Sequence, residues 1–317
     1  MSADRSSAAS AVAADEPARP VGFVGLGLLG QAMALRLASR GIPLVVWNRE
    51  AERSEALAAA GARVASSPRE VALACESVCL CVLDGAAVES VVFGPQGLAC
   101  DPGRRIRTVI DFSTVPPDRT RAIAARAAAA GISWVDAPVS GGPALAREGR
   151  LAVMAGGDPH AVAGAADLLD GLAAQVEIVG GVGAGQEMKQ LNQALVGGMF
   201  VLLAEALALA RARGLPLDRV PAGLAGGLAD SVALQKVWPR MVARDFDPPT
   251  GYAGQMLKDL EAVEAACREL DLDLPLVEVA VTQYRGFVER FGKACETVSI
   301  SRLYAADAES SGGCAAA

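Results

Sequence analysis

The chain reads Val21-Gly22-Phe23-Val24-Gly25-Leu26-Gly27-Leu28-Leu29-Gly30 near its start, and this stretch decides its fold. Four mostly apolar residues predict a buried strand, and the next six fit the pattern G-x-G-x-x-G at the opening of a helix. The first glycine permits a tight turn, the second lets the backbone approach a pyrophosphate, and the third allows close helix packing. We therefore predict a dinucleotide site built from Gly25, Leu26, Gly27, Leu28, Leu29 and Gly30. An ordinary strand-to-helix turn is the alternative.

The residues after the second strand candidate bear on the choice of dinucleotide. An NAD site usually carries an acid about 20 residues after the glycine motif, where it meets the ribose 2′-hydroxyl. Here the candidate strand 44–47 is followed by Asn48, Arg49 and Glu50. Arg49 can pair with a 2′-phosphate, and we expect Glu50 one position too far along, in the first turn of the next helix. The sequence therefore favours NADP over NAD, with Asn48 and Arg49 as cofactor contacts.

The order of strand and helix patterns predicts two domains. Through the first half, amphipathic segments alternate with strand candidates at 21–24, 44–47, 77–83, 108–111, 133–136, 151–155 and 176–179. This alternation predicts an α/β fold with a doubly wound Rossmann sheet. Beyond Gly183 the pattern is helical over 186–213, 217–229, 231–243, 252–270 and 275–291. We expect an NADP-binding Rossmann domain over 20–183, then a long helix opening an all-α C-terminal domain over 184–305, with disordered tails at 1–19 and 306–317.

Composition excludes several classes of function. Of the 317 residues 52% are hydrophobic and 21% charged, which is ample apolar material for a sizeable core. The net charge of -7 argues against a surface for nucleic acid or for anionic membranes. A site built from several histidines is excluded because His160 is the single histidine. We predict no metal site, no nucleic-acid partner and no membrane partner.

Cysteines and apolar runs bear on the compartment. The seven cysteines form no C-x-x-C pair, and the first 20 residues lack the apolar run of a signal peptide. We therefore expect reduced thiols in a cytoplasmic protein. The most membrane-like stretch, 190–204, holds 15 uncharged residues, whereas about 20 are needed to span a bilayer. It is expected to be a buried helix.

Four motifs, in order and across nearly the whole chain, resemble the β-hydroxyacid dehydrogenase family, which includes 3-hydroxyisobutyrate dehydrogenase and tartronate semialdehyde reductase. They are the glycine loop at 25–30, D-A-P-V-S-G-G at 136–142, G-A-G-Q-E-M-K at 183–189 and K-D-L at 258–260. A fifth, weaker match is D-F-S-T at 111–114. The combination is specific for the superfamily and much less so for the substrate. The resemblance implies a cleft between the two domains and a homodimer or homotetramer built on the helical domain.

The resemblance also implies which residues contact the ligands. Ser140, Gly141 and Gly142 would hold a substrate carboxylate, and consecutive glycines do expose backbone N–H groups to an anion. Leu83, Thr114 and Lys258 would contact the cofactor, with Lys258 closing over its nicotinamide end. The alternatives are a plain glycine turn at 140–142 and an exposed helix lysine at 258.

Lys189 matches the catalytic lysine of the family. A lysine can give and reclaim the proton of a carbonyl reduction when burial lowers its pKa, whereas an arginine cannot. A surface lysine near a helix start is the alternative. Many members carry an asparagine four residues later, on the same helix face, where this chain has Gln193. We expect Lys189 and Gln193 to be catalytic, with Asn192 in the substrate site but pointing about 100° away from Gln193.

Further departures from the family pattern occur at Asp84, Leu145 and Gly251, and they cluster around the expected substrate pocket. The sequence therefore predicts an NADP-dependent oxidoreductase for a small 3-hydroxy acid and its aldehyde or ketone, without assigning 3-hydroxyisobutyrate. One alternative is a C=N reductase resembling imine reductases. Another is a non-catalytic NADP-binding protein of assembly or regulation. Both kinds of relative typically lack the lysine, so Lys189 disfavours them.

Overall fold

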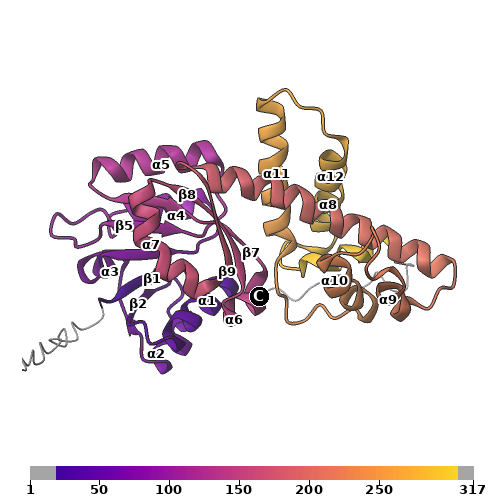
Figure 1. Ribbon diagram of the computed structural model, residues 1–317, viewed down its shortest axis with the longest axis horizontal. Coiled ribbons are helices and arrows are strands. Elements are labelled where there is room, and N and C mark those ends of the chain that lie inside the picture. The colour runs from indigo at the N-terminus through magenta and orange to yellow at the C-terminus, as the bar shows by residue number, and fades with distance from the viewer. Residues whose placement is uncertain (1–18, 306–317) are drawn as a thin grey trace, which may run out of the picture.

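The computed structural model describes residues 19–305 and consists of a β/α part and a helical part (Figure 1). The long helix α8 (Ala184–Ala212) begins beside the sheet and runs along the helical part. The alternation of strands and helices ends where α8 begins. The segments predicted as tails, 1–19 and 306–317, lie outside the described residues except for Arg19.

The sheet has the strand order β3-β2-β1-β4-β5-β6-β8-β7, and β9 pairs with the other edge of β8. From β3 to β6 all neighbours are parallel, in the order of a doubly wound dinucleotide-binding sheet. β8 runs antiparallel to β6 and β7 and parallel to β9. The strands are β1 (Val21–Val24), β2 (Leu44–Trp47), β3 (Arg63–Val64), β4 (Ser77–Leu80), β5 (Thr108–Asp111), β6 (Ser133–Asp136), β7 (Val139–Ser140), β8 (Leu151–Gly157) and β9 (Ala173–Gly180).

Both faces of the sheet are covered, which explains why its strands read as continuous apolar runs. In β1, Phe23 packs into one core with α1 and α7, and the next residue, Val24, packs into the other core with α3, α4 and α5. The covering helices are α1 (Leu28–Ser39), α2 (Glu55–Ala59), α3 (Pro68–Ala74), α4 (Gly85–Phe93), α5 (Pro117–Ala129), α6 (Gly142–Glu148) and α7 (Pro159–Leu172). The predicted Rossmann fold is confirmed.

The helical part has its own core, in which Trp238, Tyr284 and Phe287 are almost fully buried. Its further helices are α9 (Val220–Leu224), α10 (Val232–Ala243), α11 (Ala253–Glu269) and α12 (Pro275–Phe291), followed by a 3₁₀ segment, Thr297–Tyr304. The helix predicted over 217–229 is shorter, because after α9 the chain turns through Gly226, whose φ of 74° leaves the helical region. α11 and α12 pack side by side against α8 (Figure 1).

α8 is not the wholly buried helix that its sequence predicts. One face packs against α10, α11 and α12, and another leaves a row of apolar side chains 38% to 66% exposed: Met188, Leu191, Leu195, Leu202 and Leu209. Among residues 19–305, α8 is the one helix long and apolar enough to cross a membrane by length and composition, with 33% of its window buried. Its packed face belongs to the core of the helical part, so its apolarity has an explanation within the fold.

Candidate active site between the two parts of the chain

The glycine-rich loop has the geometry that a pyrophosphate requires. Gly25 has a φ of +95°, and a Cβ on Gly30 would lie 2.0 Å from the carbonyl oxygen of Gly25. A Cβ on Gly27 would meet nothing within 4 Å, so the space above this residue is open. No side chain caps α1 and no acid lies in its first turn, so its N-terminal N–H groups can receive an anion. The loop therefore fits a dinucleotide.

The corner after β2 is tied to this loop and carries two guanidinium groups, Arg49 and Arg53, beside the carboxylate of Glu50. Asn48 Oδ1 accepts a hydrogen bond from the backbone N–H of Leu26 at 2.8 Å. The carboxylate of Glu50 contacts Arg49 Nη2 at 3.0 Å and Arg53 Nε at 3.1 Å, and the hydrogen bond from Arg49 is the main cause that lowers its pKa. Glu50 precedes the 3₁₀ turn Ala51–Ser54 as its extended N-cap, so its predicted place in the first turn is wrong by one position.

Two buried carboxylates, Asp111 and Asp136, face each other at the ends of β5 and β6. Asp136 caps α8, because its two oxygens accept from Gly183 N at 2.7 Å and Gln186 N at 3.1 Å. Burial raises the pKa of Asp136, and it raises that of Asp111 to about 7, with Asp136 adding to the effect. Neither role was predicted, although Asp136 opens a motif that the sequence displays. Asp136 binds backbone about 50 residues along the chain, which spacing does not encode, whereas Asp111 accepts locally from Ser113 N at 2.9 Å.

Gln186 joins α8 to the loop that carries Thr114. This side chain is 1% exposed, its Nε2 donates to Ser113 O at 2.8 Å, and its Oε1 accepts from Val115 N at 3.1 Å. Sequence reasoning missed this role, and the only signal was the place of Gln186 within the motif at 183–189. The amide fixes the predicted cofactor contact Thr114 relative to the helix of Lys189.

Replacing Gln186 with leucine should lower the free energy of unfolding by about 1–3 kcal/mol, because it leaves a buried N–H and a buried C=O unpaired. Urea unfolding followed by circular dichroism measures this loss. Gln190→Leu is the matched control, since its side chain makes one longer bond, 3.4 Å to Ala262 O, and should cost much less. Equal stability of the two variants would contradict the assigned role.

Lys189 lies beside the turn that is expected to hold a carboxylate. Its side chain is 7% exposed, and Nζ donates to Val139 O at 2.8 Å, next to Ser140 in β7. Burial lowers the pKa of Lys189 to about 8, while Asp259 raises it and Lys258 lowers it further. Gly141 and Gly142 adopt φ values of +132° and +73°, which side chains other than glycine rarely adopt. A buried amine thus lies next to a glycine-dependent turn.

Lys258 bridges the two parts of the chain. Its Nζ donates to Leu83 O and to Thr114 O, both at 2.9 Å, and lies 3.1 Å from Asp259 Oδ1. Two of the three donors of the ammonium group are used on backbone carbonyls, and Asp259 forms an ion pair with the charge. The structure therefore brings together three residues predicted as cofactor contacts: Leu83, Thr114 and Lys258.

The amide of Gln193 is held at both ends. Its Nε2 donates to Asp259 Oδ2 at 2.7 Å, and its Oε1 accepts from Asn192 Nδ2 at 2.8 Å. The expectation that Asn192 points away from Gln193 is wrong, because its side chain reaches the amide oxygen of Gln193. Asp84, one of the departures from the family, caps α4 by accepting from Ala87 N at 2.9 Å, so it has a structural role.

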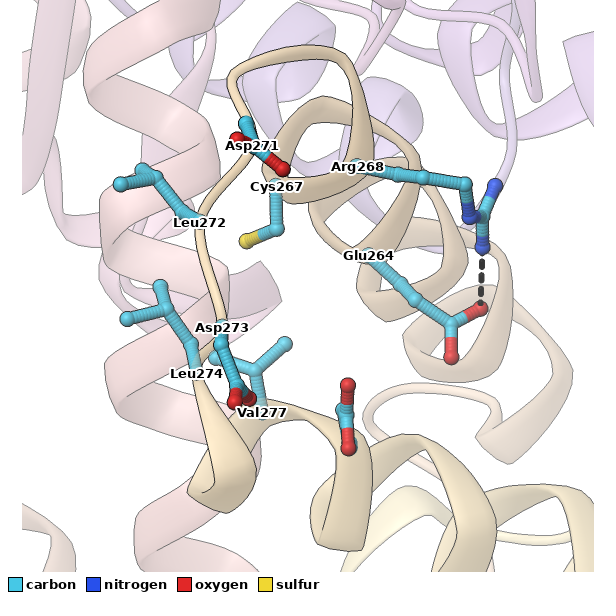
Figure 2. A pocket seen from close by; sticks show the side chains of 9 residues that line it. Glu264, Cys267, Arg268, Asp271, Leu272, Asp273, Leu274 and Val277 are labelled. Carbon is cyan, nitrogen blue, oxygen red and sulfur yellow. Dashed lines mark ion pairs between the residues drawn. The ribbon is translucent and has the colours of Figure 1, made fainter.

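Two surface hollows lie away from these residues. The first, of about 290 Å³, lies at the turn between α11 and α12 and is lined by Glu264, Cys267, Arg268, Asp271 and neighbouring residues (Figure 2). The second, of about 580 Å³, lies between α7 and β9 and is mostly apolar. Neither contains a predicted site residue. Within residues 19–305, no group of three or more His, Cys, Asp or Glu side chains could hold a metal ion.

A dinucleotide-binding sheet joined to a helical part, with a buried lysine at their junction, defines a class: the NAD(P)-dependent oxidoreductases acting on CH–OH groups. Residues 20–181 match the NAD binding domain of 6-phosphogluconate dehydrogenase, and residues 183–304 match the NAD-binding domain of NADP-dependent 3-hydroxyisobutyrate dehydrogenase. The chain belongs to the β-hydroxyacid dehydrogenase family.

Individual relatives agree with this assignment. The chain is 35% identical to the 2-hydroxy-3-oxopropionate reductase of Escherichia coli K12 over 80% of its own length and 86% of the relative's. A structure of 3-hydroxyisobutyrate dehydrogenase from Salmonella typhimurium aligns with a TM-score of 0.81 at 29% identity, over 90% of this chain and 99% of that one. A structure described as Psf3 in complex with NADP+ and 2-OPP aligns with a TM-score of 0.83 at 25% identity, over 90% and 100% of the two chains.

Proposed function

We propose that the protein interconverts a small 3-hydroxy acid, or a related alcohol, and its aldehyde or ketone, with NADP as cofactor and Lys189 as general acid and base. The observation that carries this proposal is the buried amine of Lys189 beside the Ser140 turn. Bound NADPH would supply the hydride of the reduction. Lys189 would donate a proton to the carbonyl oxygen and reclaim it in the reverse direction.

The other site residues take roles that their positions support. The loop 25–30 would hold the pyrophosphate, Asn48 and Arg49 the adenosine ribose with its 2′-phosphate, and Leu83, Thr114 and Lys258 the nicotinamide end. Ser140, Gly141 and Gly142 would bind the substrate carboxylate through backbone N–H groups and a hydroxyl. Gln193 and Asn192 would support Lys189 from the same helix, about one turn further along α8. The domain division at 20–183 and 184–305 is part of the same proposal.

We prefer NADP because Glu50, the carboxylate that could bind the ribose 2′-hydroxyl of NAD, already has partners. A ribose 2′-hydroxyl needs a free acceptor, but Glu50 contacts Arg49, Arg53 and Asn48. The guanidinium group of Arg49 is exposed, and it suits a 2′-phosphate as a charge-assisted hydrogen-bond donor.

The test is the oxidation of NADPH in the presence of small semialdehydes, keto acids and cyclic imines. Turnover of the oxo acids supports the proposal. Preference for the imines would favour a C=N reductase instead. Tight NADPH binding without turnover of any compound would favour a non-catalytic role, which the presence of Lys189 disfavours.

We further propose a homodimer formed through α8. Met188, Leu195, Leu202 and Leu209 recur every seven residues, and each is at least 38% exposed. Such a repeat is the pattern of a helix that packs lengthwise on another helix. A second copy of α8 would remove this row from water, and a tetramer would need a further contact.

Leu195→Lys should convert the dimer to a monomer, because it places a charge in the middle of the exposed α8 row. Light scattering coupled to size exclusion measures the mass. Leu276→Lys, at a position 83% exposed on α12, is the control and should leave the mass unchanged. A wild type that is already monomeric at micromolar concentration would contradict the proposal.

A cytoplasmic location is also part of the proposal. Cys75, Cys79, Cys81, Cys100 and Cys267 are free thiols, as the prediction of reduced cysteines requires. Cys295 is not among these free thiols. Cys314 lies outside the described residues.

A further inference from the structure

Among residues 19–305, Asp259 is the one side chain that contacts both Gln193 and Lys258, and it is 8% exposed. We propose that Asp259 is a positioning residue that controls the protonation of Lys189, and that Gln193 acts through Asp259 rather than on the substrate. This inference rests on the proposed function in one respect, the role of Lys189 as the proton donor.

The contacts of Gln193 leave its amide little capacity for a substrate. One donor is used on Asp259 Oδ2 at 2.7 Å, and the oxygen accepts from Asn192 at 2.8 Å. The nearest further contact of the amide nitrogen is Met256 Sδ, at 3.9 Å. The additional methylene of glutamine, relative to the family asparagine, spans the gap from α8 to α11. The departure at 193 is thereby explained as a bond to Asp259.

The second oxygen of Asp259 continues the chain of contacts. Oδ1 lies 3.1 Å from Lys258 Nζ, and Lys258 in turn donates to the carbonyls of Leu83 and Thr114 in the β/α part. A polar path therefore runs from α8 through α11 to the loops expected at the nicotinamide end. Removal of Asp259 would break this path at its centre.

Charge makes Asp259 more than a structural link. A buried carboxylate near an amine favours its protonated form, whereas a second amine opposes it, and both act at low local dielectric. Lys189 and Gln193 lie one turn apart on α8, so the carboxylate that Gln193 binds is brought near the amine. The charge of Asp259 raises the pKa of Lys189, and that of Lys258 lowers it. The neighbouring charges have other partners: Asp136 caps α8, and Glu187 pairs with Arg121 of α5. Asp111 lies across from Asp136, and β8 contributes no titratable side chain.

The test uses the scarcity of lysine in this chain. Only four lysines occur, at 189, 236, 258 and 293, so ¹³C-lysine labelling of the full-length protein gives a spectrum in which each can be titrated. Lys189→Met assigns the signal of Lys189. Asp259→Asn should move the titration midpoint of Lys189 down by about one pH unit. Glu261→Gln, which removes a carboxylate of α11 that pairs with Arg285, is the control and should leave the midpoint unchanged.

The role of Gln193 is tested by a double-mutant cycle. Gln193→Leu should lower the Lys189 midpoint by a smaller amount, because the carboxylate is then free to turn towards Lys258. The same substitution in the Asp259→Asn background should have no further effect. An unmoved midpoint in Asp259→Asn would overturn the positioning role, and an equal effect of Gln193→Leu in both backgrounds would overturn its action through Asp259.

Activity separates failure of this inference from failure of the proposed function. If Lys189 is the proton donor, the basic limb of the kcat profile in the reductive direction should move with the measured midpoint. A midpoint that moves while the kcat profile does not would mean that Asp259 controls Lys189 but that Lys189 is not the donor. A midpoint that stays fixed in Asp259→Asn while Lys189→Met abolishes turnover would retain the proposed function and reject the inference.

Discussion

Lys189→Met should lower kcat by about 10²- to 10⁴-fold, the contribution typical of general acid–base catalysis, while the affinity for NADPH changes little. The reason is geometric. The amine is buried and held at Val139 O beside the expected carboxylate turn, whereas the residues expected at the cofactor lie on the glycine loop, Leu83, Thr114 and Lys258. Steady-state kinetics combined with fluorescence titration of NADPH separates these two effects.

The pH dependence follows from the pKa of Lys189, which burial lowers to about 8. Reduction needs the protonated amine, so its rate should fall as the pH rises through about 8, and oxidation needs the neutral amine and should rise over the same range. Lys189→Arg keeps the charge but cannot release a proton at working pH. It should be nearly as damaging as Lys189→Met, and substantial activity in it would show that charge suffices.

The free energy of unfolding distinguishes a variant that has lost its proton donor from one that has lost its fold. The pKa of Lys189 is lower in the folded chain than the ordinary 10.5, so the unfolded chain binds more protons between pH 8 and 10.5, and stability rises with pH across that window. Below about pH 8 the buried charge costs stability, at about 1.4 kcal/mol for each unit of pKa difference. Lys189→Met removes this cost and also removes the hydrogen bond to Val139 O. The free energy of unfolding of this variant at pH 7 should therefore lie below that of the wild type by no more than the contribution of that one hydrogen bond.

The parts of the fold that sequence could predict are those encoded locally. The glycine loop is one, because turn, approach and packing each require glycine within six residues. The doubly wound sheet is a second such part, because its apolar strands alternate with amphipathic helices and this alternation is visible in the sequence. The two-residue strands β3 and β7 leave no such trace, and their pairing follows from tertiary contacts. The exposed face of α8 was missed because an apolar composition predicts burial but does not specify which face of the helix is buried.

The sequence predicts the residue types of the candidate site but not the bonds among them. Lys189 was found from its motif, yet its carbonyl partner Val139 lies 50 residues away. Gln186 and Asp259 carry contacts across 73 and 66 residues. The spacing of residues in the sequence does not encode contacts over such separations along the chain. Gln193 shows the consequence most clearly, since reach alone suggested a substrate contact, whereas the folded chain offers it Asp259.

Arg49→Asp should weaken NADPH binding by about 10- to 100-fold and leave NADH binding nearly unchanged. A charge-assisted contact to a 2′-phosphate contributes about 1.5–3 kcal/mol, and each 1.4 kcal/mol corresponds to a factor of ten. Arg49 is suited to this role because its side chain is 88% exposed and its present partner, Glu50, is also held by Arg53.

Calorimetric titration of NADPH and NADH into wild type and variant measures the change. Arg150→Asp removes an exposed arginine that pairs with Glu148 and should leave both affinities unchanged. The variant also replaces a positive charge with a negative one where the 2′-phosphate would bind, so the corner repels that phosphate. The assignment predicts that the wild type discriminates against NADH. Wild-type protein that binds NADH as tightly as NADPH would show that the two arginines serve only to hold Glu50.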